Sequence, residues 1–191
     1  MINSEFKNQI LDIYNYSHQY TYHILSDLNE DTVNWVPNNT KGRSIYSYFR
    51  HLVNVEIWWL YAFGKPDIWY VEEKDKVSFN NLIGKYKRLE KIYNQLVNDA
   101  SEKDMEILET KMEDNYSEFV HSKDSTYEVK IAQRGTVAWT TIRISLHCLG
   151  HISQMTYILN CLGIHKEKHP DYNWWNMTEK FIALGNLAKI Q

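Results

Sequence analysis

The sequence predicts an all-α protein built as a four-helix up-and-down bundle. Apolar residues recur at three- and four-residue steps over several long stretches, the periodicity of helices that bury one face. Punctuating residues such as Pro37, Gly42 and Gly163 separate these stretches. The chain has 191 residues, of which 43% are hydrophobic and 24% charged. We therefore expect a single domain with one substantial core over residues 1–191.

Three helices are expected in the first half of the chain. The first covers residues 4–28, where apolar side chains fall on one face. The segment NEDTVNWVPNNTKGR then breaks the pattern, so we expect a connector there. The second helix covers residues 44–62 with Ser44 as its cap, and the third covers residues 78–99.

The second half is expected to contain a small hairpin and two further helices. Residues 100–135 are the least helical part, and SEFVHSKDSTYEVKIAQRG within them alternates polar and apolar residues around a Lys-Asp-Ser turn. The longest helical pattern follows over residues 136–162 and ends at Gly163, the favoured position just beyond a helix. The tail, DYNWWNMTEKFIALGNLAK, predicts an extra C-terminal helix packed on the rest.

Charge and hydropathy exclude some classes of function. The net charge is −3, and Lys and Arg are interleaved with Glu and Asp. The sequence therefore contains no basic patch that would predict nucleic-acid binding. The N-terminus lacks the pattern of a signal peptide, and no apolar run is long enough to span a membrane. Cys148 and Cys161 would lie about 20 Å apart in one helix, beyond disulfide range. We therefore expect a cytoplasmic protein.

The segment HCLGHISQ, residues 147–154, is the strongest functional signal. His147 and His151 are four residues apart in an amphipathic helical pattern, so both imidazoles lie on one face and can bind one divalent ion. His51, in the aromatic-rich segment RHLVNVEIWWL, is the leading candidate for a third ligand. His165 and His169 have the same spacing, but their charged run HKEKHP predicts a solvated connector.

Spacing alone does not establish a metal site. Eight histidines in a chain of this length predict about 0.3 such pairs by chance. The alternative is that His147 and His151 are core histidines satisfied by hydrogen bonds. The metal hypothesis needs His51 as well, because three protein ligands with one open position make the usual catalytic site.

The order and spacing of these residues resemble the DinB/YfiT-like family of four-helix bundles. His51 followed by Glu56, Trp58 and Trp59 is similar to the family's second helix. His147, His151 and Gln154 match the family's H-x-x-x-H-R-G-Q pattern in order and spacing, whereas Ile152-Ser153 replaces its Arg-Gly pair. The resemblance implies a metal held by His51, His147 and His151, and leaves open what loss of the Arg-Gly pair does to substrate binding or helix packing.

The resemblance also implies a metalloenzyme that acts on a small-molecule substrate by hydrolysis or by transfer of a low-molecular-weight thiol. An all-imidazole set suits zinc or nickel foremost, with iron or cobalt as alternatives. A homodimer is expected because such bundles often pair. The alternative is a non-catalytic bundle whose metal site is structural or vestigial and which serves as a stress-linked binding or interaction protein. No general acid or base can be assigned, and a di-iron carboxylate bundle is set aside because no Glu-x-x-His pair occurs.

Several other residues carry two interpretations each. Gln154 lies near the face of His151 and can orient a ligand, or it is a polar residue at a helix interface. Glu56 points away from the metal direction, which favours a structural ion pair over a catalytic role. Cys148 is better interpreted as a small buried residue than as a nucleophile.

The remaining aromatic and histidine residues are expected to be structural. Most of the tryptophans, including Trp58, Trp59 and Trp139, are interpreted as core residues, whereas a tail that carries Trp174 and Trp175 can close over a bundle mouth. The histidines with no partner at useful spacing are interpreted as surface or core residues: His18, His23 and His121.

Overall fold

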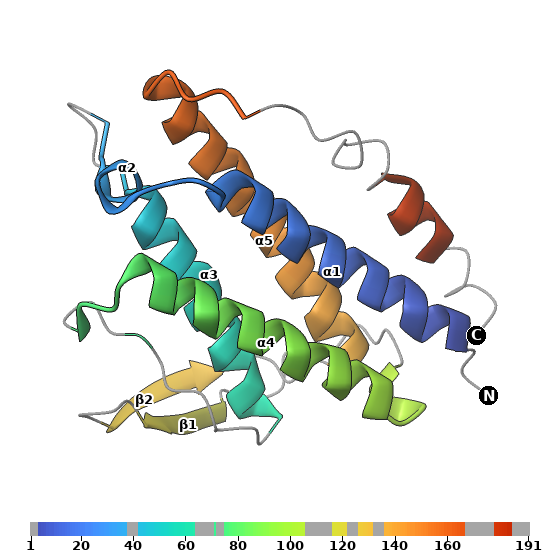
Figure 1. The fold of residues 1–191 in the computed structure, drawn as a ribbon. Coiled ribbons are helices and arrows are strands. Elements are labelled where there is room, and N and C mark those ends of the chain that lie inside the picture. The colour runs from blue at the N-terminus through green and yellow to red at the C-terminus, as the bar shows by residue number, and fades with distance from the viewer. Residues whose placement is uncertain are drawn as a thin grey trace.

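The structure, a computed structural model, describes residues 4–37, 42–63, 71, 75–105, 116–121, 126–131, 136–166 and 178–184. Most of the described chain is helical (Figure 1). Within these ranges, none of the helices combines the length and the hydropathy that a membrane span requires.

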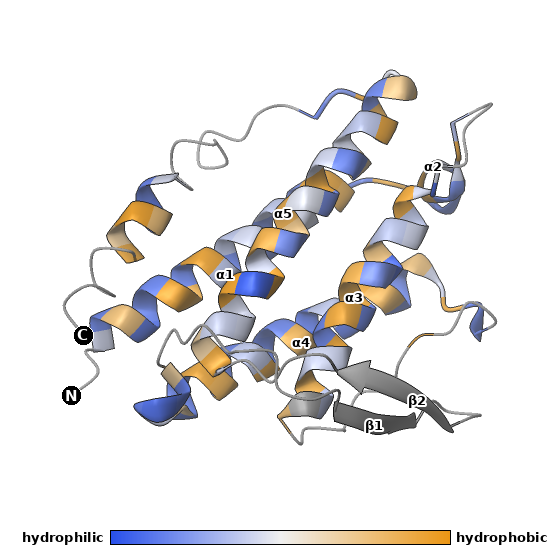
Figure 2. Ribbon diagram, turned by 180° about the vertical axis from the view of Figure 1, so that it is seen from behind, coloured by the Kyte–Doolittle hydropathy of each residue, from blue (hydrophilic) through white to orange (hydrophobic). Residues whose placement is uncertain are grey.

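Four long helices dominate the fold. They are α1 (Ser4–Leu25), α3 (Ile45–Ala62), α4 (Phe79–Asp99) and α5 (Val137–Cys161). Helix α1 packs along α5 and α4, and α3 packs against the same two helices (Figure 1). Hydrophobic and hydrophilic residues are interleaved along each of these helices, as the amphipathic pattern requires (Figure 2).

Three of the long helices begin where the sequence predicted a helix start, and each start carries a side-chain cap. A Ser or Thr hydroxyl oxygen at each start accepts a backbone N–H three residues further on, which satisfies one of the N–H groups that a first turn leaves without a partner. The capping residues are Ser44 of α3, Ser78 of α4 and Thr136 of α5. At its far end α5 stops before Gly163, whose φ of 73° is the left-handed conformation that glycine adopts without strain.

The connector between α1 and α3 differs from the prediction. Helix α1 ends at Leu25 rather than near residue 28, and Asp27 has a φ of 60°, which a helix cannot contain. A short helix that was not predicted, α2 (Glu30–Asn34), follows, and the Asn29 side chain caps it by accepting the N–H of Thr32. Five residues are too few to show helical periodicity, so the sequence pattern could not reveal α2.

The segment between α4 and α5 holds smaller elements. A single turn of 3-10 helix, η2 (Lys103–Met105), follows α4. Strands β1 (Tyr116–His121) and β2 (Thr126–Ile131) then pair antiparallel, with Tyr116 opposite Ile131. Beyond α5, residues 178–184 are helical; the rest of the predicted C-terminal helix lies outside the described residues.

The buried side chains form two apolar clusters. The larger one lies between α1, α3, α4 and α5 and includes Phe49, Leu52, Leu82, Leu89 and Met155. The smaller one gathers the start of α1 with the ends of neighbouring elements and includes Phe6, Ile10, Val97, Met105 and Leu184. Because the larger cluster holds α3 against α5, it fixes the relative positions of the helices that carry the predicted metal ligands.

Candidate metal centre

Helices α3 and α5 bring His51, His147 and His151 together. The Nε2 atoms of His51 and His147 lie 3.3 Å apart, and those of His147 and His151 lie 3.0 Å apart. One ligand atom from each of the three residues lies within 4.8 Å of the other two, and all three residues are partly buried. His147 and His151 project from successive turns of α5, whereas His51 faces them from α3.

The spacing of the nitrogens suits a metal ion. Three imidazoles bound at about 2.0–2.1 Å in a tetrahedral arrangement have their nitrogens about 3.3 Å apart. The observed separations of 3.0 and 3.3 Å are close to that value. Converging nitrogen lone pairs repel one another unless a cation or a proton lies between them, so this group can hold a single metal ion.

The electrostatic environment keeps the imidazoles neutral. Burial is the largest cause lowering the pKa of each of the three histidines. For His147, burial together with the charges of His151, His51 and Arg143 lowers the pKa to about 4. A neutral imidazole keeps a lone pair on one nitrogen, and that is the form a metal requires.

Gln154 contacts His151 directly. Its Oε1 lies 2.5 Å from Nδ1 of His151, and a carbonyl oxygen can only accept a hydrogen bond. His151 therefore carries its proton on Nδ1, which leaves the Nε2 lone pair directed at the cluster. The ring of Tyr48 packs against the same imidazole at 5.4 Å between centroids and further restricts its orientation.

Replacing Gln154 with alanine is expected to lower zinc affinity by about 10- to 100-fold, because the His151 ring loses the partner that fixes its tautomer. Competition with a chromophoric chelator measures the affinity. Ser153→Ala is the matched control, since the Ser153 hydroxyl bonds the Leu149 carbonyl instead of a histidine. Equal affinities in Gln154→Ala and the wild type would show that the amide does not orient His151.

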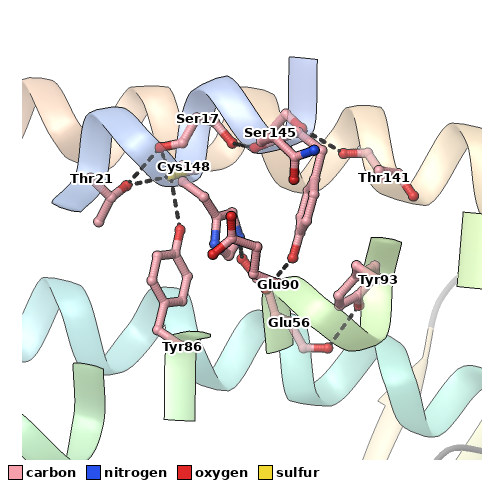
Figure 3. A network of polar contacts seen from close by, with 12 residues as sticks. Ser17, Thr21, Glu56, Tyr86, Glu90, Tyr93, Thr141, Ser145 and Cys148 are labelled. Carbon is pink, nitrogen blue, oxygen red and sulfur yellow. Dashed lines mark hydrogen bonds and ion pairs between the residues drawn. The ribbon is translucent and has the colours of Figure 1, made fainter. Parts of the chain in front are cut away.

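Glu56 belongs to the core instead of to the histidine cluster. Its carboxylate accepts hydrogen bonds from Nε2 of His18 at 2.8 Å and from the Tyr14 hydroxyl at 3.0 Å. Figure 3 shows Glu56 among the buried polar side chains of the core, with the Tyr93 hydroxyl donating to its backbone oxygen. The structural role favoured for Glu56 is confirmed, whereas its partner His18 was missed because no sequence spacing links the two residues.

Cys148 is a buried structural thiol. Its Sγ lies 3.0 Å from the Thr21 hydroxyl and 3.4 Å from the Tyr86 hydroxyl (Figure 3). Burial raises the pKa of this thiol to about 11, so it stays protonated at neutral pH. The interpretation as a small core residue is confirmed, and both Cys148 and Cys161 are free thiols.

A cavity of about 290 Å³ lies between α5 and the start of α3, and none of the three histidines is among its lining residues. Tyr48 and Gln154, which both contact His151, also line this cavity, and Arg43, Ser153 and Tyr157 complete much of its wall. The sequence indicated Gln154 but none of the other residues that line this cavity. Tyr48 could have been found, because it lies three residues before His51 and so on the same helix face.

The structure also shows where several other residues singled out in the sequence lie. Ile152 is buried in the larger apolar cluster, so the position where the family pattern has arginine serves packing here. Trp59 is buried in that cluster, and Trp58 and Trp139 pack against it, which confirms them as core residues. His165 is exposed near Asn160. Trp174, Trp175 and His169, and the side chain of His121, lie outside the described residues.

Comparisons with known proteins do not identify the chain. No family model matches it, and neither a curated protein nor a solved structure does. The geometry of the histidine cluster is therefore the main structural indication of function.

Proposed function

We propose that this protein is a metalloenzyme of the DinB/YfiT-like type that transfers a low-molecular-weight thiol to a small-molecule substrate. In this proposal the four long helices form an up-and-down bundle, and His51, His147 and His151 hold one divalent transition metal. The observation that carries the proposal is the convergence of three imidazole nitrogens from two helices, with separations of 3.0 and 3.3 Å.

The donor set suits zinc or nickel, with cobalt or iron as alternatives. Three protein ligands leave a coordination position open to water or substrate. When bound, an ion of this kind supplies Lewis acidity that lowers the pKa of a coordinated water or thiol. The protein's own contribution is to keep the imidazoles neutral by burial and to fix the His151 tautomer through Gln154.

Transfer is favoured over hydrolysis by the partners of the histidines. Among the described residues, their hydrogen-bond partners are one another and the Gln154 amide, which cannot act as a base. Hydrolysis usually uses a positioned general base. In thiol transfer the thiol proton leaves to solvent, the sulfur forms a bond to an electrophilic carbon, and the leaving group departs with its electron pair. A thiol is intrinsically more acidic than water, so this sequence depends less on a protein base than attack by water does.

The test is a comparison of two reactions on zinc-loaded protein. We expect chloride release from 1-chloro-2,4-dinitrobenzene to rise with cysteine concentration, and hydrolysis of 4-nitrophenyl acetate to stay near background. The thiol-dependent rate should fall to background in His51→Ala, which lacks one ligand. A rate that is independent of cysteine, or unchanged in His51→Ala, would contradict the proposal; full zinc loading without either reaction would support the non-catalytic alternative.

A further inference from the structure

We propose that the cavity beside the histidine cluster is a binding site for a small carboxylate with an apolar body, whose carboxylate pairs with Arg43. This inference goes beyond the proposed function, because none of the three histidines lines the cavity and, among the described residues, the two sites are linked only through Tyr48 and Gln154. It adds a residue, Arg43, that neither the histidine motif nor the family resemblance indicated.

The cavity shares two wall residues with the surroundings of His151. Tyr48 and Gln154 form part of its wall and both contact His151, the ring of Tyr48 at 5.4 Å and Gln154 Oε1 at 2.5 Å from Nδ1. A molecule in the cavity would therefore contact two residues that touch His151. The volume of about 290 Å³ is near the lower end of small-molecule sites, so the ligand is small.

Most of the wall is apolar. Pro37, Ile158 and the rings of Tyr48 and Tyr157 provide flat, non-polar contact surface. Tyr157 is 63% exposed, so an aromatic ring stands in water at the edge of this cavity. Covering it with the apolar body of a ligand would remove that surface from water, which favours binding.

Arg43 gives the cavity a positive charge. Among the described residues, no acidic side chain lines the cavity and the guanidinium forms no ion pair. Arg43 directly precedes Ser44, the cap of α3, so the positive end of that helix lies beside it.

A guanidinium fork matches the geometry of a carboxylate, to which it can donate two parallel hydrogen bonds. Arg43 is the one charged residue in the described part of the wall, so it favours a ligand with one anionic group. A neutral analogue of the same shape would keep the apolar contacts and lose the charge-assisted hydrogen bonds.

The experiment compares two probes that differ only in charge, 3-phenylpropionate and 3-phenylpropionamide, by calorimetric titration of the full chain without added metal. Leaving out the metal prevents the carboxylate from binding an ion directly. We expect the wild type to bind the carboxylate about fivefold more tightly than the amide, and Arg43→Gln to abolish that preference. Arg88→Gln, the same charge change on the exposed face of α4, should keep it.

A second variant separates the apolar contacts from the charge. Tyr157→Ala should weaken both probes to a similar extent and leave the preference for the carboxylate intact. Equal affinities of the wild type for the two probes, or an undiminished preference in Arg43→Gln, would overturn the proposal. Circular dichroism confirms that each variant folds; Arg43, Arg88 and Tyr157 are all exposed, so we expect folded proteins.

Zinc content, measured on the same preparations, separates the two proposals. Zinc binding without a carboxylate preference would overturn the inference about the cavity and leave the proposed metal function standing. A carboxylate preference lost in Arg43→Gln, in a protein that binds no zinc, would support the anion site while removing the metalloenzyme proposal.

Discussion

Replacing Glu56 with alanine is expected to lower the free energy of unfolding by about 3–5 kcal/mol. The Glu56 side chain is only 1% exposed, and its carboxylate is the hydrogen-bond partner of both His18 and Tyr14 inside the core. Without it, two buried donors lose their acceptor, and each unsatisfied buried group costs about 1–3 kcal/mol. The lost side-chain volume adds a cavity to that cost.

Denaturant unfolding followed by circular dichroism measures this change. Glu56→Gln is the matched variant, because its amide keeps the shape and still offers an oxygen to His18. We expect it to cost about 1 kcal/mol, the value of one typical hydrogen bond. If Glu56→Ala were as stable as Glu56→Gln, the contacts with His18 and Tyr14 would not contribute to stability as described.

Replacing His51 with alanine is expected to lower zinc affinity by more than about 100-fold. Loss of an outer hydrogen-bond partner already costs about 10- to 100-fold, and His51 is a direct ligand in the proposed site. It is also the ligand that joins α3 to the pair on α5, so without it the ion is held by one helix alone.

Thermal unfolding measures this loss of zinc affinity, because zinc that binds the folded state raises its stability. Free zinc at 100 times its dissociation constant stabilises the folded state by about 2.7 kcal/mol. For a chain of this size that corresponds to a rise in Tm of about 5–10 °C in the wild type. His165→Ala, which removes an exposed histidine near Asn160, should keep the full rise. A rise of the same size in His51→Ala would argue that zinc binds elsewhere.

The features that the sequence predicted correctly are local ones. Ser44, Ser78 and Thr136 mark helix starts because a cap and the periodicity that follows lie within a few residues of each other. The pairing of His147 with His151 follows from helix geometry alone. The short helix α2 and the early end of α1 were missed because a few residues carry too little pattern.

The features that depend on tertiary packing were not predictable in the same way. His18 and Glu56 are 38 residues apart in sequence, and nothing in either segment indicates that they meet in the core. The same holds for Arg43, whose importance arises from the cavity that α5 forms with the segment before α3. His51 was assigned from its helical setting and from the family resemblance. The homodimer, the cytoplasmic location and the thiol substrate stay predictions.

The most direct test of the central claim is the metal content of the purified protein, measured by elemental analysis beside the His147→Ala, His151→Ala double variant. We expect about one transition metal per chain in the wild type and almost none in the variant, because a single histidine on α3 cannot hold the ion. Absence of metal from both proteins after incubation with zinc or nickel, or equal amounts in both, would contradict a three-histidine metal centre.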